Sequence, residues 1–495
     1  MPADLSPSMA SQSVPNVPRT EHVSLAPTLR AGCPAFAWRA LVVWALLWAG
    51  VGCGPQPQRL PDELLGQRAP VLMVLIDTLR ADHTGVGGGL RATPFLDDLA
   101  AESIVFERAY ANASWTRPSV ATLFTSRLPT SHGCVNRDGR LVDELVTLAE
   151  VLQGNGYATE GVISNGNVVP NLGFGQGFDT YEHVGGRPYA TAEQMLPAVR
   201  EALDVMNDES APGFVYLHYV DPHDPYHRQP EFDFAADLPG TFDGSREAID
   251  VYRHSSTKPD STELARVHGL YDGEIAWIDA RLSELFAELE RTGVLDRAWV
   301  IVTSDHGEGL WQHGIPGHGQ HVYEEQVHVP LIFRPPGGLV GGALAVTEPM
   351  GLLDVAPTLL EFLGVAAPPG FEGRSWAGGL AGRGELPARP VIIDEKVDAF
   401  DMAAIIDGDE KLVVDHTRHL NLLFDLADNP GEIMSEALNL NVHRDARGTE
   451  LRRQLDEALL DAGQRTPMDT GGGDAMLPSS VRQQLVELGY AGEDG

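Results

Sequence analysis

Four nearly continuous apolar runs constrain the fold of this chain more than any other feature. They read APVLMVLID, FVYLHYV, AWVIVTSD and VPLIFR, at residues 69–77, 214–220, 298–305 and 329–334. Runs of this kind are typical of strands buried on both faces, because helices cover a parallel sheet from both sides. Helical patterns lie between the runs, at 93–103, 145–156 and 263–293. The alternation predicts an α/β fold around a parallel sheet.

Charge and hydrophobic content argue against a nucleic-acid-binding protein and against a disordered one. The 495 residues include 35 Lys and Arg against 70 Asp and Glu, which gives a formal net charge of −35. No basic run is present, so binding to nucleic acid through phosphate neutralisation is excluded. Hydrophobic residues make up 43% of the chain. That share is enough for a large core and argues against disorder driven by net charge.

The N-terminal segment has the pattern of an export signal. Arg39 precedes a run of apolar and small residues, 40–52, and Cys53 follows it. The run has the length of the apolar part of a signal peptide, about 7–15 residues, whereas a membrane span needs about 20. With small residues just before Cys53, this end resembles a bacterial lipoprotein cleavage site. A buried core helix is the alternative, which the basic residue before the run and GPQPQ after it disfavour.

The pattern changes near residue 385. Short strand-like runs follow, PVIID, AAIIDGDEKLVVD and NLLFDL, joined by turns such as Asp407–Gly408. They predict a small antiparallel subdomain that a helix at about 446–461 closes. A glycine-rich spacer then leads to a last helical stretch, VRQQLVELGY.

Residues that bind metals or transfer protons stand at the ends of three apolar runs. Asp77 ends the first run and Asp305 and His306 end the third, while the second carries His218 and leads to His223. In an open α/β sheet, ligands bind beyond the carboxyl ends of the strands. Taken singly, an Asp after a strand is more often a turn residue, and a His within a strand is more often a core residue.

Residues 111–133, ANASWTRPSVATLFTSRLPTSHG, predict a helix that begins near Thr116. Pro118 suits the first turn of such a helix. The free N–H groups and the dipole of a helix start favour a bound anion, and a hydroxyl there can face it. The alternative is that Thr116 is the N-cap, a common position for Thr.

Together these segments resemble the sulfatase family of the alkaline phosphatase superfamily. The similarity covers roughly residues 70–430, in the segments LIDTLRADHTG, TPFLDDLA, SWTRPSVATLFTS, LHYVDPHDPY, TSDHGEG, HGIPGHGQHVYEEQVHVPLIF and LFDLADNPGE. It implies an alkaline-phosphatase-like, mixed but mostly parallel sheet flanked by helices, with a small C-terminal antiparallel subdomain. Together with the N-terminal pattern and the change near residue 385, it predicts four parts: a signal or lipoprotein-like segment, a linker, a sulfatase-like catalytic domain, and a β-rich subdomain with a tail, at 1–53, 54–69, 70–384 and 385–495.

The resemblance implies a role for each matching residue. Thr116 falls at the nucleophile position, and His223 and His318 match residues that contact the ester or protonate its leaving group. The implied metal ligands are Asp77, Asp305, His306 and Thr116. Substrate contacts are expected from Asn165, His218 and Arg117.

Several positions depart from the sulfatase pattern. Sulfatases convert a Cys or Ser nucleophile to formylglycine, which Thr116 cannot form because its β-carbon bears a methyl group. Val120 stands where the motif has Arg, and Thr78 where the first strand usually has a second Asp. His306 stands where Asn is common. Threonine nucleophiles with an Asp-His pair occur instead in lipoteichoic acid synthases and phosphoethanolamine transferases, and two-zinc phosphodiesterases of the superfamily also use Thr.

The resemblance therefore implies an exported metal-dependent hydrolase that cleaves sulfate or phosphate esters through a Thr nucleophile. Its cofactor is one divalent metal ion, Mn, Zn, Ca or Mg, and its partner is an anionic ester, with no nucleic acid. A phosphoryl-group transferase and an inactive superfamily member acting as a binding protein remain the alternatives. We expect a periplasmic or cell-surface protein whose only membrane contact is a lipid anchor at Cys53. The sequence predicts no oligomeric state.

Overall fold

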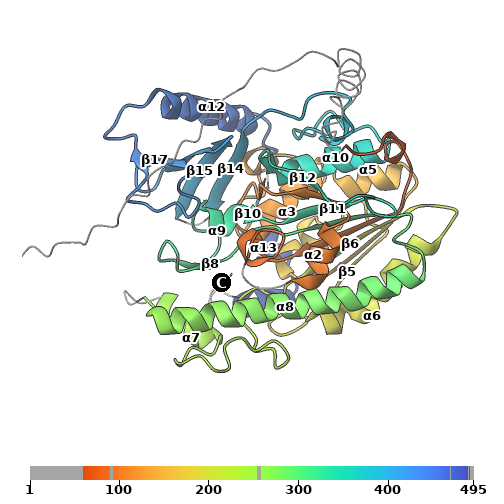
Figure 1. Ribbon diagram of the computed structural model, residues 1–495, viewed down its shortest axis with the longest axis horizontal. Helices are drawn as coiled ribbons and strands as arrows, with labels where there is room; N and C mark the ends of the chain where they lie inside the picture. The colour runs from red at the N-terminus through yellow and green to blue at the C-terminus, as the bar shows by residue number, and fades with distance from the viewer. Residues whose placement is uncertain are drawn as a thin grey trace, which may run out of the picture. The chain divides into compact units, whose positions relative to one another are not determined.

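The first apolar run forms the central strand of an eight-stranded sheet (Figure 1). In the computed structural model, β1 (Val71–Ile76) is fully buried and pairs in parallel with β6 (Gly213–Tyr219) and β7 (Trp299–Thr303). The strand order is β12-β2-β11-β7-β1-β6-β4-β5. Only β11 (Leu331–Arg334) runs antiparallel to its neighbours in this sheet of the described residues. The predicted mixed, mostly parallel sheet is confirmed.

The structure describes residues 59–89, 93–253, 258–397, 399–468, 470–488 and 490. They belong to one compact unit, Arg59–Gly495. The predicted signal segment at 1–53, with Cys53 and most of the predicted linker, lies outside the described residues. Within the described part, every helix is too short or too polar to span a bilayer.

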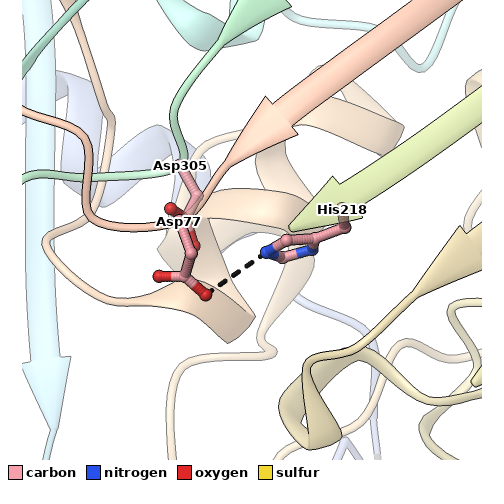
Figure 2. A group of neighbouring side chains, drawn as sticks. All are labelled: Asp77, His218 and Asp305. Carbon is pink, nitrogen blue, oxygen red and sulfur yellow. Dashed lines mark hydrogen bonds and ion pairs between the residues drawn. The ribbon is translucent and has the colours of Figure 1, made fainter. Parts of the chain in front are cut away.

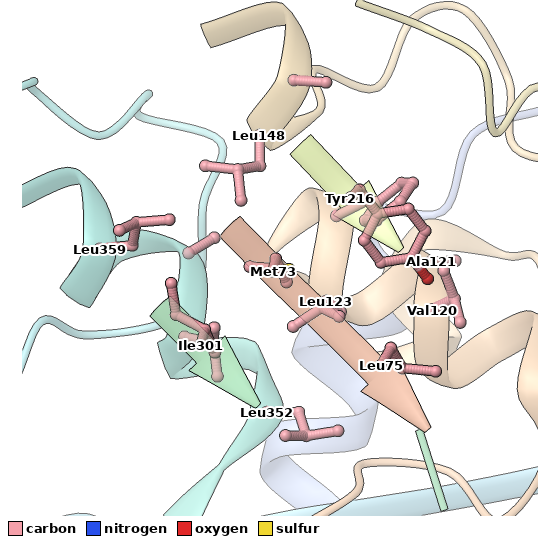
Figure 3. Packing of buried hydrophobic residues seen from close by; sticks show 14 of the residues in the cluster. Met73, Leu75, Val120, Ala121, Leu123, Leu148, Tyr216, Ile301, Leu352 and Leu359 are labelled. Carbon is pink, nitrogen blue, oxygen red and sulfur yellow. The ribbon is translucent and has the colours of Figure 1, made fainter. Parts of the chain in front are cut away.

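Alternate residues of β1 pack against the two helical layers. Leu72, Val74 and Ile76 face α6 (Ala192–Leu203) and the long α8 (Ser261–Arg291). Met73 and Leu75 face α3 (Thr116–Thr125), α5 (Leu148–Gly154) and α10 (Val355–Phe362), as Figure 3 shows for part of this cluster. Burial of both faces explains why the strand is apolar throughout.

The C-terminal part forms a second sheet. It is antiparallel, and its strands are β14 (Val391–Val397), β15 (Phe400–Asp407), β16 (Glu410–Asp415), β17 (Leu420–Asp425) and β18 (Leu438–Asn439). Leu451 and Leu455 of α12 (Ala446–Gly463) pack on one of its faces. The predicted antiparallel sheet and its closing helix are both present.

The other elements connect and cover these layers. The remaining strands are β2 (Ile104–Phe106), β3 (Ala109–Tyr110), β4 (Ala158–Ile163), β5 (Thr180–His183), β8 (Gly309–Leu310), β9 (Pro316–Gly317), β10 (His328–Val329), β12 (Leu344–Val346) and β13 (Met350–Gly351). The remaining α-helices are α2 (Pro94–Ala100), α4 (Pro129–His132), α7 (Arg246–Arg253), α9 (Glu324–Val327), α11 (Ala377–Leu380), α13 (Gly473–Met476) and α14 (Ser479–Glu487). Short 3₁₀ turns are η1 (Asp62–Leu64), η2 (Ala81–His83), η3 (Gly166–Val168), η4 (Pro170–Leu172), η5 (Asp204–Asn207) and η6 (Leu352–Asp354).

Strand β14 anchors the segment that leads into α3. The carboxylate oxygen Oε2 of Glu395 accepts hydrogen bonds from the amide N (2.7 Å) and the hydroxyl (2.9 Å) of Ser114. One strand position earlier, the amide N of Asp394 donates to the carbonyl of Asn112 at 2.9 Å. The second sheet therefore fixes the chain two residues before Thr116, where α3 begins.

Glu395 makes stability depend on pH. Burial raises the pKa of Glu395 from 4.5 to about 7, against the hydrogen bonds from Ser114. A carboxyl whose pKa is raised by folding stabilises the fold below its unfolded pKa, and this stabilisation is lost as pH rises through 7. Glu395→Gln resembles the protonated form at every pH. The difference in free energy of unfolding between this variant and the parent protein should therefore increase by about 3 kcal/mol, in favour of the variant, from pH 4.5 to pH 8. Urea unfolding at several pH values measures the difference, and a difference that stays constant with pH would contradict the assignment.

Candidate active site and metal centre

Strand register brings three side chains together at the carboxyl edge of the sheet. Leu75 of β1 pairs with both His218 of β6 and Thr303 of β7. Asp77 and Asp305 each follow two residues later, so they emerge at the same level, beside His218. Figure 2 shows the three side chains converging, and their ligand atoms lie within 4.8 Å of one another. The distance from His218 Nε2 to Asp77 Oδ2 is 3.3 Å.

The charges of this group suit a bound cation. Oδ1 of Asp77 and Oδ2 of Asp305 are buried and have no hydrogen-bond partner among the described residues. Burial raises the pKa of Asp305, and the Asp77 carboxylate adds to the effect. Burial also acts to raise the pKa of Asp77, but the hydrogen bond from His218 and the nearby histidines hold it below its usual range. Two buried carboxylates with free oxygens beside imidazoles fit a divalent metal ion, which relieves their repulsion.

His306 faces the same point. Its Nε2 lies 3.4 Å from Asp305 Oδ2 and 3.7 Å from Asp77 Oδ1. Its Nδ1 lies 2.8 Å from the carbonyl oxygen of Gly307 and donates to it. That bond fixes the tautomer and leaves the lone pair of Nε2 directed at the carboxylates, as a metal ligand requires. All three residues expected to hold the metal besides Thr116 thus converge, and His218, expected to contact substrate, joins them.

Thr116 begins α3 next to this group. Its Oγ1 lies 3.3 Å from His306 Nε2 and is fully buried. The N-cap of the helix is Trp115, in extended conformation and without a side-chain capping bond. The alternative of a capping role for Thr116 is therefore wrong. Ser119, one turn further along α3, donates from its hydroxyl to the carbonyl of Asp305 at 2.5 Å, which ties the helix to the turn that carries Asp305.

Asn165 links the Asp77 carboxylate to Thr116. Its amide Nδ2 donates to Asp77 Oδ2 and lies 3.5 Å from Thr116 Oγ1. Its Oδ1 accepts a hydrogen bond from the amide N of Asn167 at 2.8 Å, which fixes the orientation of the side chain. The structure therefore brings Asn165 into the site.

His223 and His318 face each other across the mouth of the site. The Nε2 atoms of the two rings lie 2.9 Å and 2.7 Å from one hydroxyl oxygen, that of Tyr490. His318 Nδ1 lies 3.3 Å from Glu308 Oε1, and His223 Nδ1 donates to the carbonyl of Asp224. Burial lowers the pKa of both imidazoles, that of His318 to about 3. Both rings are neutral near pH 7 while the site holds no anion.

The predicted role of Arg117 does not agree with its contacts. Its guanidinium is buried and donates to the carbonyl of Gly139 at 3.0 Å and to Oδ1 of Asn167 at 3.3 Å. A further donation goes to the carbonyl of Arg137. These bonds hold the loop after α4, so we assign Arg117 a structural role and remove it from the substrate contacts.

Two residues of the site were not predicted. Glu308 lies within the motif TSDHGEG, but only the fold shows that its carboxylate faces His318. Burial raises the pKa of Glu308 to about 8, with the Asp224 carboxylate adding to the effect. Tyr490 ends the last helical stretch and carries no local pattern that points to the site.

Comparison with known proteins agrees with this geometry. The family model described as Sulfatase matches residues 70–365, more than half of the chain. An arylsulfatase of Clostridium perfringens is 26% identical over 377 residues, covering 62% of this chain and 77% of its own. Two solved structures share the fold. BT4656, in complex with its substrate D-glucosamine-2-N,6-O-disulfate, has a TM-score of 0.66 at 18% identity and covers 82% of this chain and 99% of its own. The phosphonate monoester hydrolase of Agrobacterium radiobacter has a TM-score of 0.63 at 21% identity, with coverages of 80% and 96%.

Metal content tests the carboxylate group. We expect the purified protein to bind about one Mn²⁺ or Zn²⁺ per chain, and Asp305→Asn to lose most of it, because the amide removes a charged ligand. Asp279→Asn, the same substitution at a buried carboxylate that accepts hydrogen bonds from the amides of Phe95 and Leu96, is the matched control and should keep the metal. Elemental analysis after dialysis gives the ratio. Equal metal content in the two variants would place the cation elsewhere.

Proposed function

Because the chain belongs to the sulfatase family, we propose that it is an exported, metal-dependent hydrolase that cleaves sulfate, phosphate or phosphonate esters through Thr116. The observation that carries this proposal is the position of one hydroxyl. Thr116 Oγ1 lies 3.3 Å from His306 Nε2, which itself lies 3.4 Å from Asp305 Oδ2. An otherwise weak nucleophile thus stands beside a group built for a divalent cation. The relatives named as an arylsulfatase and a phosphonate monoester hydrolase support an anionic ester as substrate.

Asp77, Asp305 and His306 would hold the metal ion, with His218 beside them. A bound divalent ion supplies Lewis acidity, which lowers the pKa of a hydroxyl and polarises an ester oxygen. The nitrogen donors favour Mn²⁺ or Zn²⁺ over Ca²⁺ and Mg²⁺.

Thr116 is held for attack by its surroundings. Its place at the start of α3 exposes it to the positive end of the helix dipole, which stabilises developing negative charge. Asn165 Nδ2, 3.5 Å away, can donate to the oxygen as charge builds up. Attack of Oγ1 on the sulfur or phosphorus forms a Thr ester, as the Thr hydroxyl loses its proton to solvent and the bond to the leaving alcohol breaks. Water then attacks the Thr ester and gives a proton to the imidazole that protonated the alcohol. The bond to Oγ1 breaks, and Oγ1 takes up a proton to restore the hydroxyl.

His223 and His318 are the candidate general acids that protonate the leaving oxygen. An anionic ester in the site favours the charged form of both imidazoles and so raises the pKa values that burial has lowered. Either Nε2 then gives its proton to the departing oxygen. Glu308 holds His318 through Nδ1, and the backbone of Asp224 holds His223.

The proposed export rests on the sequence pattern at 40–53, which lies outside the described residues. The mass of the mature protein tests this proposal. Cleavage before Cys53 removes residues 1–52 and lowers the mass, whereas a lipid on Cys53 adds to the mass of the shortened chain. An unprocessed N-terminus would contradict export by this route.

Substitution of Thr116 tests the nucleophile. We expect Thr116→Ala to lower kcat/KM by at least about a thousandfold on the preferred ester, because the covalent step is lost. Thr116→Ser should keep most of the activity. Thr125→Ala, a buried Thr of the same helix whose hydroxyl bonds the carbonyl of Ala121, is the matched control. Assays on 4-nitrophenyl sulfate, phosphate and phenylphosphonate with Mn²⁺ or Zn²⁺ give the comparison. Full activity of Thr116→Ala would refute the assignment.

Leaving-group dependence tests the two histidines. The loss of a general acid costs roughly 10²–10⁴-fold when the leaving alcohol is a weak acid, and much less for 4-nitrophenol, which departs without a proton. We expect His223→Asn or His318→Asn to show this contrast between an alkyl and a nitrophenyl ester. His227→Asn, next to the same motif, should show none. Equal losses on both esters in both variants would mean that neither imidazole is the acid.

A further inference from the structure

The last described residue of the chain lies inside the site. Helix α14 carries Val481 and Leu485 into the core beside the central sheet, and Leu488 follows them there. Gln484 of this helix donates from Nε2 to the carbonyl of Ser164 at 2.8 Å, next to Asn165. The helix is thus fixed against the site by its own contacts. The chain after it reaches the site at Tyr490.

The hydroxyl of Tyr490 touches three groups at once. It lies 2.7 Å from His318 Nε2, 2.9 Å from His223 Nε2 and 3.5 Å from Thr116 Oγ1. Its ring packs against both imidazoles, with 5.7 Å between centroids in each pair, and against the indole of Trp115 at 6.4 Å. Only 8% of Tyr490 is exposed.

These contacts are the ones that the leaving oxygen of an ester needs. In a displacement at sulfur or phosphorus, the attacking and leaving oxygens lie roughly in line on opposite sides of the central atom. The phenol oxygen contacts both the candidate nucleophile, Thr116 Oγ1, and the two candidate acids. It therefore occupies the position of the departing alcohol.

Tyr490 also leaves no room for a substrate beside it. Thr116, Asp77 and His223 have no exposed surface. The cavity at Tyr490 measures about 50 Å³ and is lined by Trp115, Arg137, His318, Gly319, Gln320, Val397, Phe400 and Tyr490 itself. A volume of that size holds a few water molecules but no ester. An ester reaches Thr116 only if Tyr490 moves.

We propose that Tyr490, just after α14, closes the leaving-group side of the site as an internal stand-in for the product alcohol, which an ester must displace. The proposal rests on the proposed function for the identity of the surrounding groups. Displacement of Tyr490 leaves α14 in place, because Val481, Gln484 and Leu485 hold this helix independently. Access to the candidate metal centre is then controlled by Tyr490.

Anion binding tests this proposal without relying on turnover. We expect metal-loaded Tyr490→Ala to bind orthovanadate at least about tenfold more tightly than the parent protein, because no internal group competes for the site. Tyr490→Phe, which keeps the ring but loses the bonds to the histidines, should lie between them. Tyr157→Phe, a buried Tyr outside the site, is the matched control and should bind as the parent does. Titration calorimetry measures the affinities, and equal or weaker binding by Tyr490→Ala would overturn the proposal.

Hydrogen exchange of the parent protein gives a second readout that needs no variant. Saturating orthovanadate should raise exchange at the C-terminal end of α14 and beyond it, while exchange in α12 stays unchanged. Unchanged or slower exchange after α14 would overturn the proposal, even if Tyr490→Ala fails to fold.

Turnover separates this proposal from the proposed function. If Tyr490→Ala binds orthovanadate more tightly but no form of the protein cleaves an ester, the closure stands and the hydrolase assignment fails. If the parent protein cleaves esters as fast as Tyr490→Ala and binds orthovanadate equally well, the closure fails and the hydrolase assignment stands.

Discussion

The repulsion between two buried carboxylates organises this protein. Asp77 and Asp305 emerge side by side because β1 and β7 pair in parallel in a register that places them at the same level. Neither carboxylate can be buried at that spacing at low energetic cost unless positive charge or protons compensate. The neighbouring His218 and His306 lower the pKa of Asp77, and the divalent cation that we propose would relieve the remaining repulsion. The rest of the site is arranged around this requirement.

The surrounding elements each fix one group relative to that pair. Ser119 binds the carbonyl of Asp305, and Glu395 holds Ser114, so both ends of the turn that presents Thr116 are anchored. Asn165 bridges the Asp77 carboxylate and the Thr116 hydroxyl. The antiparallel C-terminal sheet thus contributes to the position of Thr116, the proposed nucleophile, although none of its described residues belongs to the candidate metal group. This division explains why a mostly parallel sheet and a separate small sheet occur in one compact unit.

The sequence predicts those parts of the fold in which burial requires apolar residues. The continuous apolar runs predicted the central strands. Asp77, Asp305 and His306 were predicted as site residues because they stand at the ends of these runs. The direction in which the His218 side chain points could not be predicted, because a strand buried on both faces has no polar face that marks the orientation of its side chains. The direction of Arg117 was equally undetermined, since a long side chain can reach a carbonyl as readily as a ligand. Tyr490 was beyond prediction, because its place follows from the packing of α14 against distant residues.

If Thr116 is the nucleophile, its hydroxyl is covalently esterified during turnover, and peptide mass spectrometry of the acid-quenched protein detects this ester. With a slowly hydrolysed aryl ester, we expect the peptide containing Thr116 to gain the mass of one sulfuryl or phosphoryl group, and to lose it again when the substrate is exhausted. Steady turnover with that peptide unmodified, or with the added mass on another residue, would contradict it.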